Sequence, residues 1–176
     1  MSVMRAVVVA FTTVLLYLLP TATFAQELRS DGEIKAAIAK LGANTGSFDQ
    51  FEILYKNPRR STELLIASLH SVRRGQYQSG RHPQVVWMIR ALRSLTGLNF
   101  RAQTQAELTD DEAHFLDHNA STNDVNFFGT WMSRDRTWVA PLDAQTTIIR
   151  KWREWFEKKG NTFTYVNDRN FDNWYF

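Results

Sequence analysis

The stretch PQVVWMIRALRSLTGLNF, Pro83 to Phe100, carries the clearest helical pattern of the chain, with both of its ends marked. Proline is tolerated in the first turn of a helix, and Gly97 can take the left-handed conformation that closes one. An apolar stripe at helical spacing consists of Val85, Met88, Ile89, Leu92 and Leu95. Trp87 widens this stripe, and Arg90 and Arg93 lie away from its centre, so we expect this helix to pack against neighbours.

Three further helical patterns precede this stretch. They predict helices over Asp31–Leu41, Ser47–Asn57 and Ser61–Arg74, the second ended by Pro58. The apolar pattern of the third helix recurs 23 positions later in the Pro83–Phe100 helix. Two consecutive helices with the same pattern and a short link predict an antiparallel helix pair.

The first 25 residues have the anatomy of a secretory signal peptide. Arg5 precedes an uncharged apolar run over Ala6–Leu19, and Thr23-Phe24-Ala25 places small residues at a cleavage point after Ala25. The run is shorter than the roughly 20 apolar residues of a spanning helix, which argues against an uncleaved membrane anchor. No cysteine follows it, so a lipoprotein anchor is excluded. We predict an exported protein, periplasmic or extracellular, with a single domain over residues 26–176.

Composition and charge limit the kinds of site and of partner that the chain can have. The chain has no cysteine, which excludes disulfides, thiol nucleophiles and thiolate metal sites. Nine basic residues and one acidic residue lie between Lys56 and Arg101, whereas six acidic and no basic residues lie between Ala102 and Asp124. The blocks form either a basic face for an anionic partner or, as we favour, a mutually neutralising pair. Export argues against nucleic acid as a partner.

Residues 101–144 interrupt the helical patterns and are predicted to be an irregular insertion between core helices. Thr109 and Glu112 form a capping box, which predicts a short helix to about His118. Asn119–Asn126 is typical of a loop, and Phe127–Pro141 of an irregular or weakly extended segment. Asn119-Ala120-Ser121 also fits a glycosylation acceptor, which matters only in a eukaryotic source.

Helical spacing returns at Asp143, a candidate N-terminal cap, and continues to Gly160. Its apolar stripe is wide and aromatic and consists of Ile148, Ile149, Trp152, Trp155 and Phe156. Alternating polar and apolar residues over Thr162–Val166 leave a short C-terminal strand open. The aromatic end, Phe171–Phe176, predicts a tail that docks onto the domain.

Two of these segments together resemble a known family. ALRSLTGLNF, Ala91–Phe100, and WREWF, Trp152–Phe156, are similar to an ending common in bacterial HEAT-repeat proteins. There, a helix closing in L-T-G and an aromatic residue precedes paired aromatics. The resemblance implies an all-α fold of stacked antiparallel helix pairs and a scaffold or binding role without built-in chemistry. The 101–144 insertion departs from that pattern, and a compact helical domain with one elaborated side fits the sequence equally well.

His114 and His118 are the candidate metal ligands, because their spacing places two imidazoles on one face of a helix. Asp111 and Asp117 are near enough in the sequence to assist. The competing interpretation is a solvated helix face, since the capping box already explains this segment and the signature H-E-x-x-H is absent. A small metal-dependent hydrolase centred on this pair is the alternative function. Without a nucleophile elbow or a phosphate loop, we favour no catalytic activity and no cofactor.

A partner-binding surface is the favoured prediction. The insertion is rich in aromatic and arginine residues, the types that dominate interface hot spots, and its candidates are Phe127, Phe128, Trp131, Arg134, Arg136 and Trp138. The competing interpretation is that the two tryptophans anchor the insertion to the helical core. We predict a non-catalytic binding or scaffold protein that recognises a protein or an envelope component, for example an immunity-type inhibitor. A cell-wall-binding structural module is a further alternative.

Overall fold

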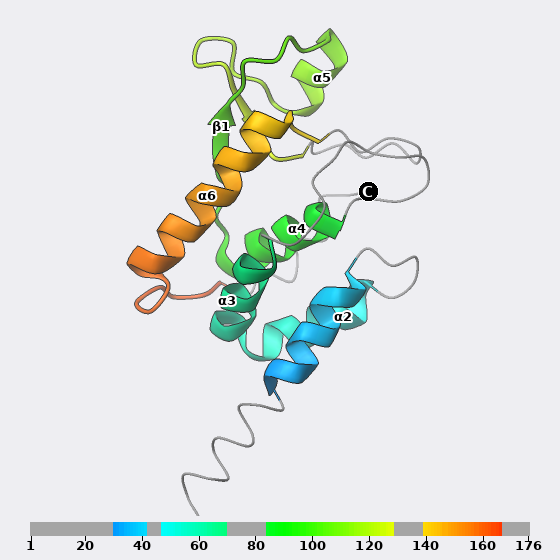
Figure 1. The fold of residues 1–176 in the computed structure, drawn as a ribbon, viewed down its shortest axis with the longest axis vertical. Coiled ribbons are helices and arrows are strands. Elements are labelled where there is room, and N and C mark those ends of the chain that lie inside the picture. The colour runs from blue at the N-terminus through cyan, green and yellow to red at the C-terminus, as the bar shows by residue number, and fades with distance from the viewer. Residues whose placement is uncertain (1–29, 42–46, 70–83, 129–138, 167–176) are drawn as a thin grey trace, which may run out of the picture.

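The computed structural model describes residues 30–41, 47–69, 84–128 and 139–166 (Figure 1). Within these ranges the protein is mostly helical and has a small antiparallel sheet of two strands, which confirms the predicted helical class. The predicted signal peptide and the aromatic tail lie outside the described residues. The elements in chain order are the helix of residues 30–40, α2 (Ser47–Lys56), α3 (Pro58–Ser68), α4 (Gln84–Thr96), β1 (Arg101–Gln103), α5 (Asp110–Phe115), β2 (Asp124–Asn126) and α6 (Leu142–Lys159).

A cap and a proline separate α2 from α3. The side-chain oxygen of Asn57 accepts a 3.3 Å hydrogen bond from the backbone N–H of Arg60, and Pro58 occupies the first turn, where its missing N–H costs nothing. The prediction that Pro58 ends the preceding helix is confirmed, but the predicted start of the next helix at Ser61 is wrong. Ser61 lies inside α3, where its hydroxyl donates a 2.8 Å hydrogen bond to the carbonyl of Leu54 and ties α3 to α2.

Helix α4 packs against both α2 and α3 and is covered on nearly all sides. Every residue of Val85–Thr96 except Trp87 is buried. The sequence placed Arg90 and Arg93 away from the apolar stripe, but both are buried because aromatic rings cover them. The guanidinium carbon of Arg90 lies 4.9 Å from the centre of the Trp87 ring, and that of Arg93 lies 4.7 Å from the centre of the Phe128 ring.

The end of α4 is set by Gly97, as predicted. Its φ of 69° is left-handed, and its N–H donates a 2.7 Å hydrogen bond to the carbonyl of Arg93. The chain returns to this point after α6, where the N–H of Val166 donates a 3.1 Å hydrogen bond to the carbonyl of Leu95. Residues 162–166 pair in no strand, so the short strand that the sequence left open does not form there.

The small sheet joins the two ends of the acidic segment. Ala102 in β1 lies opposite Val125 in β2, and both side chains are buried. The prediction that Asn119–Asn126 is loop throughout is therefore wrong, because a strand of three residues is too short to show a period in the sequence. Helix α6 packs along β1, and Figure 1 shows β1 and α5 gathered around the start of α6.

Helix α5 begins as the sequence predicts and ends earlier. Thr109 and Glu112 form the reciprocal capping box, with hydrogen bonds of 2.9 and 3.3 Å between backbone N–H groups and side chains. The helix ends at Phe115, and Asp117 takes a positive φ of 49° that turns the chain. The predicted extension of this helix to His118 is therefore wrong.

Helix α6 supplies the largest side chain of the core. Trp152 is fully buried and packs edge-on against Phe100, with their ring centres 4.7 Å apart. The helix ends at Gly160, as predicted, where a Cβ would lie 2.5 Å from the ring of Phe156. The predicted N-terminal cap, Asp143, is instead the second residue of the helix, and Pro141 precedes its start without a side-chain cap.

One hydrophobic cluster joins these segments, with the exception of α5, which has no buried residue. It takes side chains from the helix of residues 30–40, from α2, α3, α4 and α6, and from both strands. The insertion is thus attached to the helical core through buried apolar contacts. None of the helices in the described ranges combines the length and the apolar character needed to span a membrane.

Candidate functional site

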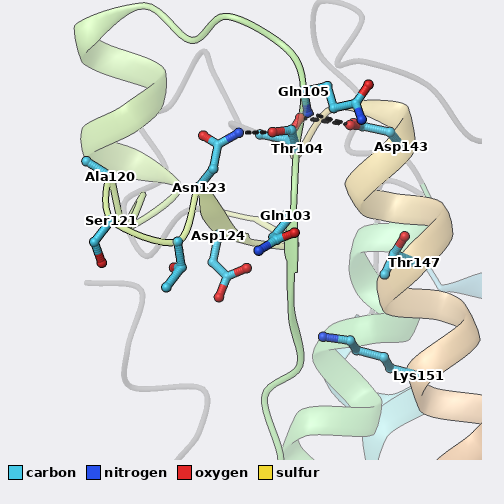
Figure 2. Close-up of a pocket in the computed structure, with 11 residues that line it drawn as sticks. Gln103, Thr104, Gln105, Ala120, Ser121, Asn123, Asp124, Asp143, Thr147 and Lys151 are labelled. Atoms are coloured by element: carbon cyan, nitrogen blue, oxygen red, sulfur yellow. Dashed lines mark hydrogen bonds between the residues drawn. The ribbon is translucent and has the colours of Figure 1, made fainter.

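An open cleft of about 920 Å³ lies where the insertion meets α6 (Figure 2). Its walls are residues 103–105 at the end of β1, residues 120–124 before and at the start of β2, and Asp143, Thr147 and Lys151 on one face of α6. All of these residues except Ala120 carry a polar side chain, and we call the site the polar cleft. Its volume is in the range of small-ligand sites in proteins.

Asp143 fixes the wall of β1 to the wall of α6. Its carboxylate accepts hydrogen bonds of 2.8 Å from the backbone N–H of Gln105 and 3.0 Å from the hydroxyl of Thr104, and another of 2.8 Å from the N–H of Ala144. Burial alone would raise the pKa of Asp143, but these hydrogen bonds outweigh it and hold the pKa below the ordinary value. Asp143 is therefore a structural carboxylate, held in its ionised form.

Asn123 fixes the third wall to the same strand end. Its φ of 53° is left-handed, a conformation that asparagine tolerates better than most residues. Its side-chain amide donates a hydrogen bond to the carbonyl of Thr104, and its backbone carbonyl accepts a 3.0 Å hydrogen bond from the N–H of the same residue. The side-chain oxygen of Asn123 lies 2.8 Å from Nε2 of His118. The turn of residues 120–124 is thereby held in place from both sides.

The cleft wall next to the glycosylation motif, Asn119-Ala120-Ser121, is also held by hydrogen bonds within the turn. The side-chain oxygen of Asn119 accepts hydrogen bonds of 3.0 Å from the N–H of Ser121 and 2.7 Å from its hydroxyl. Its backbone N–H donates a 2.8 Å hydrogen bond to the carbonyl of Asp124. The predicted acceptor site therefore lies in a fixed turn at the rim of the polar cleft.

A hydrogen bond to β1 holds the side chain of Lys151 in place. Its ammonium donates a 2.7 Å hydrogen bond to the carbonyl of Arg101, whose guanidinium pairs with the carboxylate of Asp117. The guanidinium also donates a 3.2 Å hydrogen bond to the carbonyl of Asp124. Among the described residues, Arg101–Asp117 is the ion pair that joins the basic and acidic blocks of the sequence, so the blocks neutralise each other only in part.

Several polar groups of the cleft remain open to a ligand. Within the described residues, no hydrogen bond or ion pair engages the carboxylate of Asp124, the side-chain amide of Gln103 or the hydroxyl of Thr147. Figure 2 shows Gln103 between Asp124 on one side and Thr147 and Lys151 on the other. The arrangement presents a carboxylate, an amide, a hydroxyl and an ammonium along one cleft.

The predicted metal ligands do not form a site in the described part of the chain. The prediction that His114 and His118 share a helix face is wrong, because α5 ends at Phe115, between them. Asp111 is exposed, and Asp117 is engaged by an arginine. The described ranges contain no group of three or more histidine, aspartate or glutamate side chains that could hold a metal ion.

The predicted partner-binding residues separate into two groups. Phe127 and Phe128 are buried in the core, so the prediction that they extend an exposed patch is wrong. Trp131, Arg134, Arg136 and Trp138 lie outside the described residues. The residues that flank this segment pair with each other: Phe128 bridges to Val139, and the N–H of Ala140 donates a 2.9 Å hydrogen bond to the carbonyl of Phe127.

The polar cleft was not predicted from the sequence. The spacing of Asp143, Thr147 and Lys151 indicates that the three side chains share one helix face. What no local pattern shows is that β1 packs beside that face, since β1 finds its partner β2 across a long connection.

Comparisons with known proteins found no matching family model, no matching curated protein and no matching solved structure.

Proposed function

We propose that this chain is an exported, non-catalytic binding protein whose polar cleft recognises a component of the cell envelope. The observation that carries the proposal is an open cleft of about 920 Å³, with a frame fixed by hydrogen bonds and with polar groups left for a ligand. A site of this size suits a ligand of a few sugar or amino-acid units. Its lining favours a ligand that is polar and hydrated before it binds.

The hydrogen bonding of the lining favours binding over chemistry. The Ser121 hydroxyl donates to the side chain of Asn119, and the Asp143 carboxylate is occupied by backbone N–H groups and a hydroxyl. Neither group is poised as a nucleophile or a general base. None of the residues that line the cleft is a histidine. A frame in which the Asp143 carboxylate is already satisfied favours a rigid binding site, because little reorganisation is needed when a ligand enters.

The test is retention on envelope material. Protein purified from cells that express the full chain should sediment with isolated cell-wall material and bind its soluble glycan and peptide fragments. A double substitution inside the cleft, Gln103→Ala with Thr147→Val, should weaken this binding about fivefold or more, whereas the control Asp111→Asn on α5 should leave it unchanged. Equal binding by both variants, with unchanged circular dichroism, would overturn the role of the cleft.

Export has a separate test. Protein recovered from the cell envelope fraction should begin at Gln26 when its mass is measured, because cleavage is expected after Ala25. Recovery of the intact chain from the cytoplasm would overturn this part of the proposal and leave the cleft as a binding site for another polar ligand.

A protein partner remains a second proposal, in which a scaffold with HEAT-like stacked helix pairs presents Trp131, Arg134, Arg136 and Trp138 to one target. The paired residues Phe128 and Val139 support it, since they close the base of the segment that carries these side chains. Replacement of Trp131 and Trp138 by alanine should then abolish capture of a soluble partner while binding to wall material persists.

A further inference from the structure

We infer that the polar cleft binds a zwitterionic ligand, a short peptide whose free amino group is received by Asp124 and whose free carboxylate is received by Lys151. The inference rests on the proposed function, because it names the chemistry of the ligand that the same cleft takes. It follows from the placement of Asp124 and Lys151 on opposite walls, because the third charged group of the cleft, the Asp143 carboxylate, is occupied by hydrogen bonds from the protein itself.

The two charges come from elements on either side of β1. Asp124 is in β2, directly opposite Gln103 of β1, and Lys151 is in α6, which packs along β1. Figure 2 shows Asp124 on one side of β1 and Lys151 on the other, with Gln103 between them, and all three residues line the cleft. The strand therefore separates the carboxylate from the ammonium.

Each charged group is held in place and retains bonding capacity. Lys151 uses one N–H for its 2.7 Å hydrogen bond to the carbonyl of Arg101, which leaves two donors for a ligand. The backbone carbonyl of Asp124 accepts from Asn119 and Arg101, which fixes the residue, while no described residue engages its carboxylate. The carboxylate can accept several hydrogen bonds from an ammonium group.

Asp124 and Lys151 form no ion pair with each other, and no other described residue forms an ion pair with the Asp124 carboxylate. A ligand with one charge would meet one favourable and one unfavourable partner across the same cleft. A ligand that carries both charges satisfies both walls, so the pair selects for a zwitterion.

Two neutral groups of the cleft suit a peptide backbone: Gln103 lies between the two charges, and Thr147 lies on α6 beside Lys151. The side-chain amide of Gln103 offers donors and an acceptor, and the hydroxyl of Thr147 offers one donor and an acceptor. A tripeptide places two amide groups between its charged ends, and its size is compatible with a cleft of about 920 Å³. The Asp124 carboxylate and the Lys151 ammonium therefore bind the two charged ends of the peptide, and the neutral side chains hydrogen-bond to its amide groups.

The test compares three probes by nuclear magnetic resonance titration of the full chain: tri-alanine, N-acetyl-tri-alanine and tri-alanine amide. Tri-alanine should bind about threefold to fivefold more tightly than either blocked probe, the size expected of ion pairs that solvent still reaches. Asp124→Asn should remove the preference for tri-alanine over N-acetyl-tri-alanine and keep the preference over tri-alanine amide. Lys151→Gln should remove the preference over tri-alanine amide and keep the preference over N-acetyl-tri-alanine. The controls Asp111→Asn and Lys158→Gln should retain both preferences.

The outcomes separate this inference from the proposed function. Equal binding of the three probes, or none, overturns the inference even when wall material is bound. Preference for tri-alanine without binding to wall material supports the inference and overturns the proposed ligand source. Because Lys151 also donates a hydrogen bond to Arg101, the variant Lys151→Arg is needed to keep the charge. This variant should keep the preference for tri-alanine over tri-alanine amide. Loss of that preference in a variant whose nuclear magnetic resonance spectrum is otherwise unchanged would overturn the role of the charge.

Discussion

The Asp143 carboxylate accepts a 2.8 Å hydrogen bond from the backbone N–H of Gln105, 38 positions earlier in the chain. The hydroxyl of Thr104 donates to the same carboxylate. One side chain of α6 therefore positions the segment that follows β1, and with it one whole wall of the polar cleft. Asp143 is a positioning residue, since its oxygens are occupied by the protein itself.

Asp143→Asn should destabilise the protein by about 1 kcal/mol, because the amide can replace only part of the acceptor capacity of the carboxylate and solvent reaches the site. Urea unfolding followed by circular dichroism measures the loss. The matched control is Asp49→Asn, which removes an exposed carboxylate from the first turn of α2 and should cost about 0.5 kcal/mol or less. Equal losses would mean that Asp143 acts only on the helix dipole.

The contribution of Asp143 should depend on pH with a defined sign. Its folded-state pKa lies below the ordinary value of 3.8, so its stabilisation is present above that value and is lost as the pH falls through the lowered pKa. The difference in unfolding free energy between the parent and Asp143→Asn should be constant near neutral pH and shrink below about pH 4.

Asp31 does not affect this comparison between the parent and Asp143→Asn. Its hydrogen bond with Arg60 lowers its pKa as well, which adds acid sensitivity to the parent and to the variant alike. The contribution of Asp31 therefore cancels in the difference. A difference that grows on acidification would contradict the assigned hydrogen bonds of Asp143.

The two histidines of the acidic segment should behave differently from each other. His118→Ala should cost about 0.5 to 1 kcal/mol, because it removes the contact with Asn123, whereas His114→Ala should be close to neutral at its exposed position. Added zinc should leave the thermal unfolding midpoint of the parent unchanged. Zinc stabilisation that either substitution abolishes would restore the metal hypothesis.

The features that sequence analysis predicted are those decided within about one helical turn. Gly97 closes α4 because its own φ is left-handed, and the capping box of Thr109 and Glu112 requires only residues three positions apart. Such signals need no partner from elsewhere in the chain. The helical class, the end of α4 and the start of α5 were accordingly predictable.

The features that were not predictable depend on distant contacts. Ala102 and Val125 pair across a long connection, and neither short strand has a period of its own. Asp143 carries the sequence signal of a helix cap, but its oxygens serve a segment 38 positions away. Arg90 looks solvated from its place on the helix, and only the position of the Trp87 ring explains its burial. The polar cleft combines several such contacts.

Two glycine substitutions should change stability in opposite directions. Gly97→Ala should cost about 1 kcal/mol, because a side chain disfavours the φ of 69°. The nearest side-chain atom, in Val166, would lie 3.4 Å from the new Cβ, which is ordinary contact, so strain in the backbone rather than a clash sets the cost. Gly32→Ala is the matched control: it lies in the helix of residues 30–40, and its Cβ would meet nothing within 4 Å. It should stabilise the protein by about 0.5 to 1 kcal/mol, since alanine favours the helix.

Urea unfolding of both variants with equal m-values measures the two shifts, and stabilisation by Gly97→Ala would show that α4 does not end in the left-handed turn.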